Sequence, residues 1–188
     1  GGGSSDAGFF LKLLNEHYGN VYNEKELEEL AMKVGSDVPF FIKNKTARVG
    51  GKGNKVELVE NNLKDSLILV KPLGFGVSTK DAYNSFDELD EVRYANFEKI
   101  VECLRNDNRK DLEKYIENGL EQGISERNAD IKMFKAILNS VVPGKKFFMS
   151  GSGSTYYTFV TEIERSQIET RLRTFVDNVK IIISKTIN

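Results

Sequence analysis

Residues 145–160 read KKFFMSGSGSTYYTFV, and this stretch decides the fold of the second half of the chain. The apolar runs 145–150 and 155–160 have the length and the aromatic content of strands. The run SGSGST at 150–155 is rich in glycine and predicts a tight loop. The stretch therefore predicts two strands joined by a loop.

The segments around this pair of strands extend the prediction. Residues 66–72, SLILVKP, form an apolar run that Pro72 ends, and residues 179–185, VKIIISK, form another, so both are expected to be strands. Helical patterns lie at 78–89, 96–106, 109–122, 128–141 and 162–176. The order strand, helices, strand, strand, helix, strand predicts a split βαβ, or ferredoxin-like, arrangement with extra helices inserted.

The first part of the chain predicts two helices and a few short strands. The helices are expected at 7–18, with its N-cap among residues 4–6, and at 23–34. The apolar run Val38–Ile42 contains Pro39, which favours a strand edge or a loop that enters a strand. Short strands are expected at 46–49 and 56–59.

These first elements do not make a complete domain. Two helices and a few short strands leave no sheet with a covered face, so we expect further chain before Gly1 in the whole protein. The polar segment 61–65 is turn-like and is the candidate boundary. We therefore predict two domains, 1–63 and 64–188.

The composition is that of an ordinary globular protein, with 188 residues, 39% hydrophobic and 29% charged, and a formal net charge of −1. This balance excludes a basic surface for nucleic acid or an anionic membrane. No apolar run approaches the ~20 residues of a membrane span. The single cysteine, Cys103, excludes an internal disulfide and is expected to be a buried helical thiol in a reducing compartment. We expect a cytoplasmic location.

Three features are candidates for chemistry. Residues 1–5, GGGSS, run into a predicted helix whose N-terminus could hold a phosphate, and the alternative is a flexible linker. The run 150–155 offers more amides and hydroxyls than a turn requires, and the alternative is a plain hairpin loop. Asp37 is either a turn former or a base near a buried site. The residues taken singly leave these alternatives open.

Three stretches, in this order and at these separations, resemble the galactokinase–homoserine kinase–mevalonate kinase–phosphomevalonate kinase superfamily. GGGSSDA at 1–7 is similar to the back half of the family's ATP loop, VGSDVPFFIK at 34–43 to its most distinctive signature, and MSGSGSTYYTFV at 149–160 to its C-terminal glycine loop. Further similar segments are TARVGGKGNKVE at 46–57, VKPLGFGVSTKDAY at 70–83 and NGLE at 118–121. Within the superfamily, the chain most resembles the family of 4-diphosphocytidyl-2-C-methyl-D-erythritol kinases.

The resemblance implies a two-domain small-molecule kinase fold of the α+β class. A truncated N-terminal α/β domain, 1–63, would bind ATP, and a ferredoxin-like C-terminal domain with inserted helices, 64–188, would bind the substrate. The implied reaction transfers the γ-phosphoryl group of ATP to the 2-hydroxyl of 4-diphosphocytidyl-2-C-methyl-D-erythritol, in non-mevalonate isoprenoid synthesis. The partner would be this small molecule, without nucleic acid or membrane, and a homodimer is left open.

The resemblance also implies residue roles. The ATP phosphates would be held by Gly1, Gly2, Gly3, Ser4 and Ser5. Asp37 corresponds to the catalytic aspartate, which accepts or orients the proton of the substrate hydroxyl. Mg²⁺ would bridge the phosphates, with Ser4 or Ser5 as a further ligand, and no side-chain cluster is predicted as a metal site. Tyr83 would stack on the cytosine ring or, alternatively, pack in the core. The substrate cleft would be lined by Gly151, Ser152 and Gly153.

The chain departs from the family pattern. Gly8 stands where Ala is usual, and Gly119 replaces the usual acidic residue of the Asn-Asp-Leu-Glu segment. The family's N-terminal segment, with a catalytic lysine and part of the cytidine pocket, is not in this chain, so we expect the 188-residue chain to be inactive by itself. Two alternatives remain: another small-molecule kinase of the superfamily, and a non-catalytic binding module.

Overall fold

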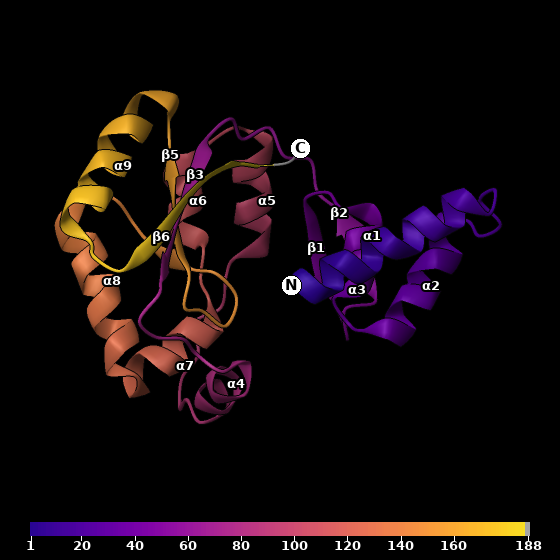
Figure 1. Ribbon diagram of the computed structural model, residues 1–188, viewed down its shortest axis with the longest axis horizontal. Coiled ribbons are helices and arrows are strands. Elements are labelled where there is room, and N and C mark those ends of the chain that lie inside the picture. The colour runs from indigo at the N-terminus through magenta and orange to yellow at the C-terminus, as the bar shows by residue number, and fades with distance from the viewer. Residues whose placement is uncertain (187–188) are drawn as a thin grey trace. The chain divides into compact units, whose positions relative to one another are not determined.

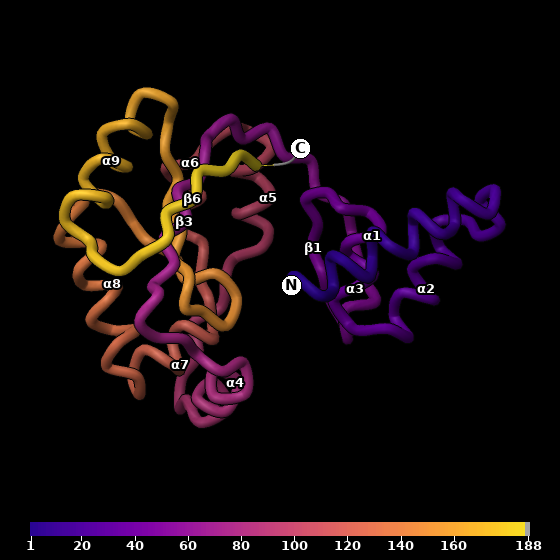
Figure 2. Tube along the Cα trace, viewed as in Figure 1, coloured from indigo at the N-terminus to yellow at the C-terminus, as the bar shows by residue number. Residues whose placement is uncertain are grey.

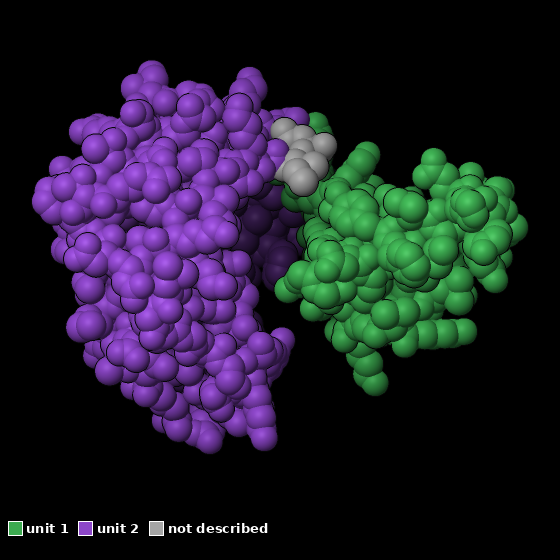
Figure 3. Space-filling model, in the orientation of Figure 1, with its two compact units in different colours: residues 1–61, 187–188 green, residues 62–186 purple. Residues whose placement is uncertain are grey.

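The computed structural model describes residues 1–186, which form two compact units, residues 1–61 and residues 62–186 (Figure 3). Each unit has a hydrophobic core of its own and is described by itself. None of the helices described has both the length and the apolar character needed to cross a lipid bilayer.

The second unit is built on a four-stranded antiparallel sheet (Figure 1). Its strands are β3 (Ser66–Pro72), β4 (Phe148–Met149), β5 (Tyr156–Val160) and β6 (Val179–Lys185). They lie in the order β4-β5-β3-β6, so β3 is central and β4 is an edge strand. In the register of β3, Ser66 lies opposite Val160 of β5 and Lys185 of β6. This order, with helices after β3 and after β5, confirms the predicted ferredoxin-like arrangement.

The second unit, residues 62–186, also contains six helices. They are α4 (Thr79–Asp87), α5 (Phe97–Arg105), α6 (Arg109–Tyr115), α7 (Gly119–Arg127), α8 (Ala129–Val141) and α9 (Glu162–Phe175). The prediction of one helix at 109–122 is wrong, because Asn118 caps a new helix and the chain is extended at Ile116. The strand predicted at 145–150 is only two residues long, because only Phe148 and Met149 pair with β5.

Helices cover both faces of the sheet. Because side chains alternate along each strand, each strand contributes to the core on both faces. Ile68, Val70 and Tyr156 lie on the face that packs against α7, α8 and α9. Leu67 and Phe159 lie on the opposite face. Their partners there come from α5 and α6 and include Cys103 and Leu112, so the cysteine is buried as expected. Figure 1 shows the sheet between these two layers of helices.

The first unit contains three helices and a hairpin, traced from its indigo start in Figure 2. The elements are α1 (Gly2–His17), α2 (Glu24–Val34), α3 (Val38–Lys43), β1 (Ala47–Gly50) and β2 (Lys55–Leu58). The strand edge expected at Pro39 is wrong, because proline lies here in the first turn of α3, where a helix requires no N–H group from it. The N-cap of α1 is Gly1 and not one of residues 4–6.

The first unit has a small core and a wide exposed apolar surface. Its buried side chains are Leu27, Ala31, Val38 and Ile42, and Ala7 and Leu11 of α1 pack against them. Phe9, Phe10 and Leu13 of α1 leave large apolar side chains exposed, and so does Tyr18, the residue that follows the helix. The sheet of this unit is the two-stranded hairpin alone in the described residues. The exposed apolar side of α1 therefore has no covering layer among the described residues of this unit.

A cluster of partly buried ion pairs links the residue before β3 to α6, α9 and the segment before β4. Arg109 Nη1 lies 2.9 Å from Asp65 Oδ1 and 3.1 Å from Glu164 Oε2, and Lys145 Nζ lies 2.8 Å from the same oxygen of Glu164. Partial burial works to raise the pKa of Glu164, but hydrogen bonds from Lys145 and from the backbone of Thr161 outweigh it. With the charges of Lys145 and Arg109, they lower the pKa of Glu164 to about 2.

The Glu164 ion pairs predict a pH-dependent contribution to stability. A carboxyl group whose pKa is lower in the folded state stabilises the fold above its unfolded pKa of about 4.3 and loses this effect as the pH falls toward 2. Glu164→Gln keeps the capping box with Thr161 but removes the charge. We expect it to reduce the free energy of unfolding by roughly 1 kcal/mol near pH 7. The effect is no larger because the ion pairs of Glu164 with Arg109 and Lys145 are partly solvent-accessible.

The measurement is urea unfolding of both chains between about pH 7 and about pH 2. The difference between them should shrink as the pH falls. Burial raises the pKa of Asp65 and of Glu113, which gives the opposite pH dependence, so only the difference between the two chains is diagnostic. A difference that stays constant with pH would contradict this role of Glu164.

Candidate functional site

The first turn of α1 carries the predicted ATP-binding residues. The N–H of Ser5 donates to the carbonyl oxygen of Gly1 at 2.8 Å, whereas the N–H groups of Gly2, Gly3 and Ser4 have no intrahelical acceptor. A Cβ added to Gly2 or Gly3 would meet no atom within 4 Å. The GGGSS run is therefore the start of a helix and neither a loop nor a flexible linker. It presents three unpaired amides and the positive end of the helix dipole in open space.

Asp37 lies in the same unit, as the N-cap residue of α3. The turn before it is closed by the N–H of Val38, which donates to the carbonyl oxygen of Gly35 at 3.1 Å, and the Asp37 side chain makes no capping hydrogen bond. The residue is exposed, and its carboxylate has no hydrogen bond or ion pair to any described residue. The turn does not need this carboxylate, which leaves it available to a ligand.

Close approaches at two glycines hold neighbouring segments on the Asp37 turn. A Cβ on Gly8 of α1 would lie 2.6 Å from Phe41 Cβ and 3.3 Å from the carbonyl oxygen of Val38, the residue after Asp37. Gly53, at the tip of the β1–β2 hairpin, has φ +92, and a Cβ there would overlap the carbonyl oxygen of Ser36. The first unit therefore packs α1 and the hairpin tip against the residues that flank Asp37.

The glycine loop of the second unit, residues 150–154, joins β4 to β5. The N–H of Ser150 donates to Thr155 O at 2.8 Å, and the N–H of Gly153 donates to Ser150 O at 3.0 Å. Gly151 and Gly153 have φ values of +56 and +89, which favour glycine. The N–H groups of Gly151 and Ser152 have no hydrogen-bond partner among the described residues. This loop turns the chain and also presents free donors.

The glycine loop meets the segment that follows β3. A cavity of about 460 Å³ lies between residues 71–77 and residues 153–155. Ser152 Oγ lies 3.2 Å from Thr79 Oγ1, at the start of α4. Tyr83 lies one turn further along α4 and is 54% exposed, so the alternative that it packs in the core is wrong. The fold thus brings the 70–83 and 149–160 segments together, as their shared resemblance implies.

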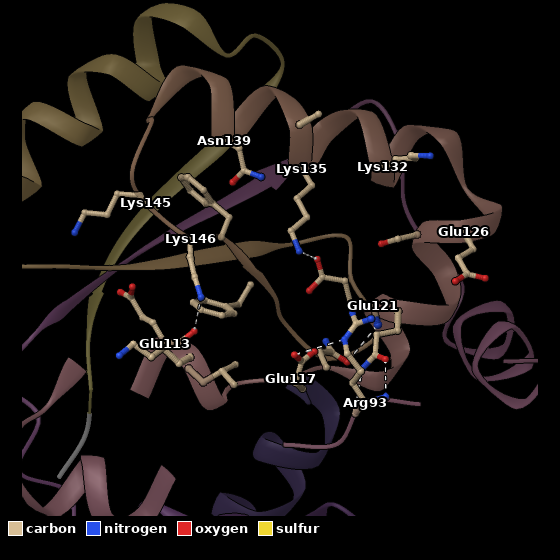
Figure 4. A pocket seen from close by; sticks show the side chains of 18 of the residues that line it. Arg93, Glu113, Glu117, Glu121, Glu126, Lys132, Lys135, Asn139, Lys145 and Lys146 are labelled. Carbon is tan, nitrogen blue, oxygen red and sulfur yellow. Dashed lines mark hydrogen bonds and ion pairs between the residues drawn. The ribbon is translucent and has the colours of Figure 1, made fainter. Parts of the chain in front are cut away.

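A second and larger cavity, of about 810 Å³, lies beside the edge strand β4 and was not predicted (Figure 4). Its lining is densely charged, with Arg93, Lys132 and Lys146 among the exposed cations. Glu121 on α7 is buried at its wall, and its Oε1 accepts a hydrogen bond from Lys135 Nζ at 2.6 Å, drawn as a dashed line. Opposite charges compensate one another along the wall, so the cavity offers no field of one sign to a ligand.

Two residues of this region, for which the sequence predicted no role, hold the glycine loop. Asn118 Nδ2 donates to Met149 O and to Gly151 O, both at 2.9 Å, and Glu121 Oε2 accepts from the N–H of Met149 at 3.1 Å. The pattern Asn-x-x-Glu is typical of a helix N-terminus and signals the cap. It gives no signal of the contacts to Met149 and Gly151, about thirty residues away.

Helix α4 packs closely on α7 through glycines. A Cβ on Gly123 would lie 2.6 Å from the backbone of Ser85 and Phe86, and one on Gly119 would lie 2.5 Å from the Phe86 ring. Phe86 thus fills the space beside the position where the family has an acidic residue. Because α4 carries Thr79 and Tyr83, this contact fixes where both side chains stand.

The fold is that of the small-molecule kinases to which the motifs point. A crystal structure of 4-(cytidine 5'-diphospho)-2C-methyl-D-erythritol kinase superposes with a TM-score of 0.75 and 24% identity, over 98% of this chain and 65% of that one. The homoserine kinase of Cytophaga hutchinsonii superposes with a TM-score of 0.65 and 16% identity, over 93% of this chain and 61% of that one. At these identities the likeness establishes the fold alone.

The sequence supports a more specific relationship. The chain is 79% identical over all 188 residues to the 4-diphosphocytidyl-2-C-methyl-D-erythritol kinase of Fusobacterium nucleatum, and spans 64% of the length of that protein. The resemblance inferred from the motifs is thereby confirmed. No protein-family model matches the chain.

The α4–α7 contact predicts that Gly123→Ala destabilises the second unit. Alanine favours a helix by about 1 kcal/mol over glycine, but its Cβ would overlap the backbone of α4, and overpacking costs typically 1–3 kcal/mol. We expect a net loss of about 1 kcal/mol in urea unfolding. Gly76→Ala is the control, since a Cβ there meets nothing within 4 Å and the φ of Gly76 is ordinary. Equal stability of the Gly123→Ala chain and the unchanged chain would contradict the close packing.

Proposed function

We propose that the protein is an ATP-dependent kinase that phosphorylates the 2-hydroxyl of 4-diphosphocytidyl-2-C-methyl-D-erythritol in isoprenoid precursor synthesis. The observation that carries the proposal is the 79% identity to a kinase of that name along the whole chain. The locations of the glycine-rich helix start 1–5, of the glycine loop 150–154 and of Asp37 support it, because each stands at an exposed turn or helix end with free hydrogen-bonding groups.

The first unit supplies the nucleotide-binding half of the proposed reaction. The ATP phosphates would lie against the run Gly1–Ser5 at the N-terminus of α1, where the free amides of Gly2, Gly3 and Ser4 donate to phosphate oxygens. The Asp37 carboxylate accepts the proton of the substrate 2-hydroxyl. As the oxygen bonds to the γ-phosphorus, the bond from that phosphorus to the β–γ bridging oxygen breaks and ADP leaves.

Magnesium fits this half only as a companion of the nucleotide. No group of three or more His, Cys, Asp or Glu side chains among residues 1–186 could hold a metal ion. Mg²⁺ commonly takes most of its ligands from phosphates and water, with one or two protein oxygens. Ser4 or Ser5 would supply such an oxygen, and the ion would offset phosphate charge. The Ser5 hydroxyl donates to Gly2 O at 2.8 Å, which leaves its lone pairs available.

The second unit supplies the proposed substrate-binding half. Free amides of Gly151 and Ser152, with Gly153 beside them, suit an anionic or polar group of the substrate. Tyr83 exposes its ring on α4 and would stack on the cytosine. The protein would act on this small molecule in the cytoplasm, and a homodimer stays a prediction. The expected inactivity of the 188-residue chain by itself also stays a prediction.

Two alternative functions would be consistent with the same loops. A different kinase of the superfamily would share the loops but prefer another alcohol, such as homoserine or mevalonate. A binding module would keep the ligand contacts without turnover. Asp37→Asn and Tyr83→Ala separate these cases. The first removes the proposed proton acceptor, and the second removes the aromatic ring that would contact the cytosine.

Asp37→Asn tests the chemistry in the full-length gene product. Removing the proton acceptor should lower turnover by roughly 10²–10⁴-fold, the usual contribution of a general base, and leave the KM for ATP within a few-fold. ADP release at saturating substrate measures this. Glu29→Gln, an exposed carboxylate on α2, is the matched control and should keep full activity. Unchanged turnover in Asp37→Asn would remove Asp37 from the chemistry.

Tyr83→Ala tests the substrate contact by calorimetry with cytidine diphosphate. Base–aromatic stacking contributes about 1–3 kcal/mol, so the affinity should fall on the order of 10-fold, while Tyr83→Phe should keep it. Tyr94→Ala, at another exposed tyrosine of the second unit, is the control. If Tyr83→Ala binds as tightly as the unchanged protein, Tyr83 is not part of the nucleotide surface.

A further inference from the structure

Asn118 uses every hydrogen-bonding group of its side-chain amide. Its Oδ1 accepts from the N–H groups of Leu120 at 3.0 Å and of Glu121 at 3.4 Å, which caps α7. Its Nδ2 donates its two hydrogens to Met149 O and Gly151 O, both at 2.9 Å. An amide with two donors and two acceptor sites is thus fully satisfied. One side chain joins a helix start, a strand end and the glycine loop.

The contacts at Met149 occupy the open edge of the sheet. Met149 is the last residue of β4, the edge strand, and both of its backbone groups bond to α7: the carbonyl to Asn118 and the N–H to Glu121. Glu121 is itself fixed by Lys135 at 2.6 Å. These side chains take the place of a neighbouring strand, so the β4 end cannot shift relative to α7 without breaking charged or buried bonds.

The hydrogen bond from Asn118 to Gly151 O also fixes the start of the loop. Gly151 O is held by Asn118, and the N–H groups of Gly151 and Ser152 stay free. The far side of the loop is held by Thr79 Oγ1, 3.2 Å from Ser152 Oγ. Thr79 begins α4, and α4 packs on α7 at Gly123. Both sides of the loop therefore depend on one helix, and Asn118 is the direct link.

We propose that Asn118 is a positioning residue that presets the 150–154 loop to receive the polar groups of the substrate. It acts through the loop and touches no substrate itself. Without its two donors the peptide unit that carries the Gly151 carbonyl and the Ser152 N–H is free to rotate, so the Ser152 amide loses its fixed orientation relative to that of Gly151. The proposal rests on the proposed function only in naming what the loop receives, since the anchoring itself is a property of the chain.

Asn118→Asp tests the proposal, with Asn128→Asp as the matched control. Aspartate is as good an N-cap as asparagine, so both variants keep their helices. At position 118 the change removes both donors and faces a carboxylate oxygen toward two carbonyl oxygens. At position 128 the asparagine side chain caps α8 by accepting from the N–H of Ile131, so the same change removes no side-chain donor contact among the described residues.

The first readout is amide hydrogen exchange of the 188-residue chain, followed by NMR. The amides of Ser150 and Gly153 close the loop and should exchange at least 10-fold faster in Asn118→Asp, while those of Ile68 and Leu69 in β3 should not change. Asn128→Asp should change neither. Unchanged loop exchange overturns the proposal. So does a uniform increase over loop and sheet, since that is a loss of overall stability.

The second readout is the affinity for cytidine diphosphate, which should fall about 10-fold in Asn118→Asp of the full-length gene product. If the unchanged protein does not bind cytidine diphosphate, the proposed function fails, but the exchange result still decides the role of Asn118. Asn118→Ser is the second variant: its shorter side chain can cap α7, carries no charge and lacks the two amide donors. It should reproduce the fast loop exchange. Failure of both variants to fold overturns the proposal in favour of a purely structural role.

Discussion

The amide of Asn118 donates to Met149 O and Gly151 O, and the arrangement of the second unit around its glycine loop depends on this pair of bonds. They place the N-terminus of α7 at the end of the edge strand. Gly123 then sets how closely α4 approaches α7, and α4 in turn sets the location of Thr79 and Tyr83. A loop with free amides can be precise only if its carbonyl groups are fixed, and here a helix cap does that.

The sheet of the second unit could be predicted because its strands are apolar on both faces and end at clear breaks. In β3, Ile68 packs against one layer of helices and Leu67 against the other, so the apolar residues of this strand form a continuous run. Pro72 is the last residue of the strand. Pro39 misled the prediction because proline suits a strand edge and a helix start equally well. Only the packing of Val38 and Ile42 in the core of the first unit decides for α3.

The candidate site could be predicted where the signal is local and not where it depends on distant contacts. Exposed loops such as 150–154 show their glycines in the sequence. The role of Asn118 could not be predicted, because its partners Met149 and Gly151 lie far along the chain. The same holds for Gly119, a departure from the family pattern. A Cβ at Gly119 would lie 2.5 Å from the Phe86 ring, a contact that the sequence does not signal.

The proposed function assigns the nucleotide to the first unit and the cytidine diphosphate-linked alcohol to the second. The most direct measurement is mass spectrometry of the products formed by the full-length gene product with ATP and magnesium. The alcohols 4-diphosphocytidyl-2-C-methyl-D-erythritol, homoserine and mevalonate would be supplied together. We expect that only the first alcohol gains one phosphoryl group, with one ADP formed for each. Phosphorylation of homoserine or mevalonate instead, or no phosphorylated product at all, would contradict it.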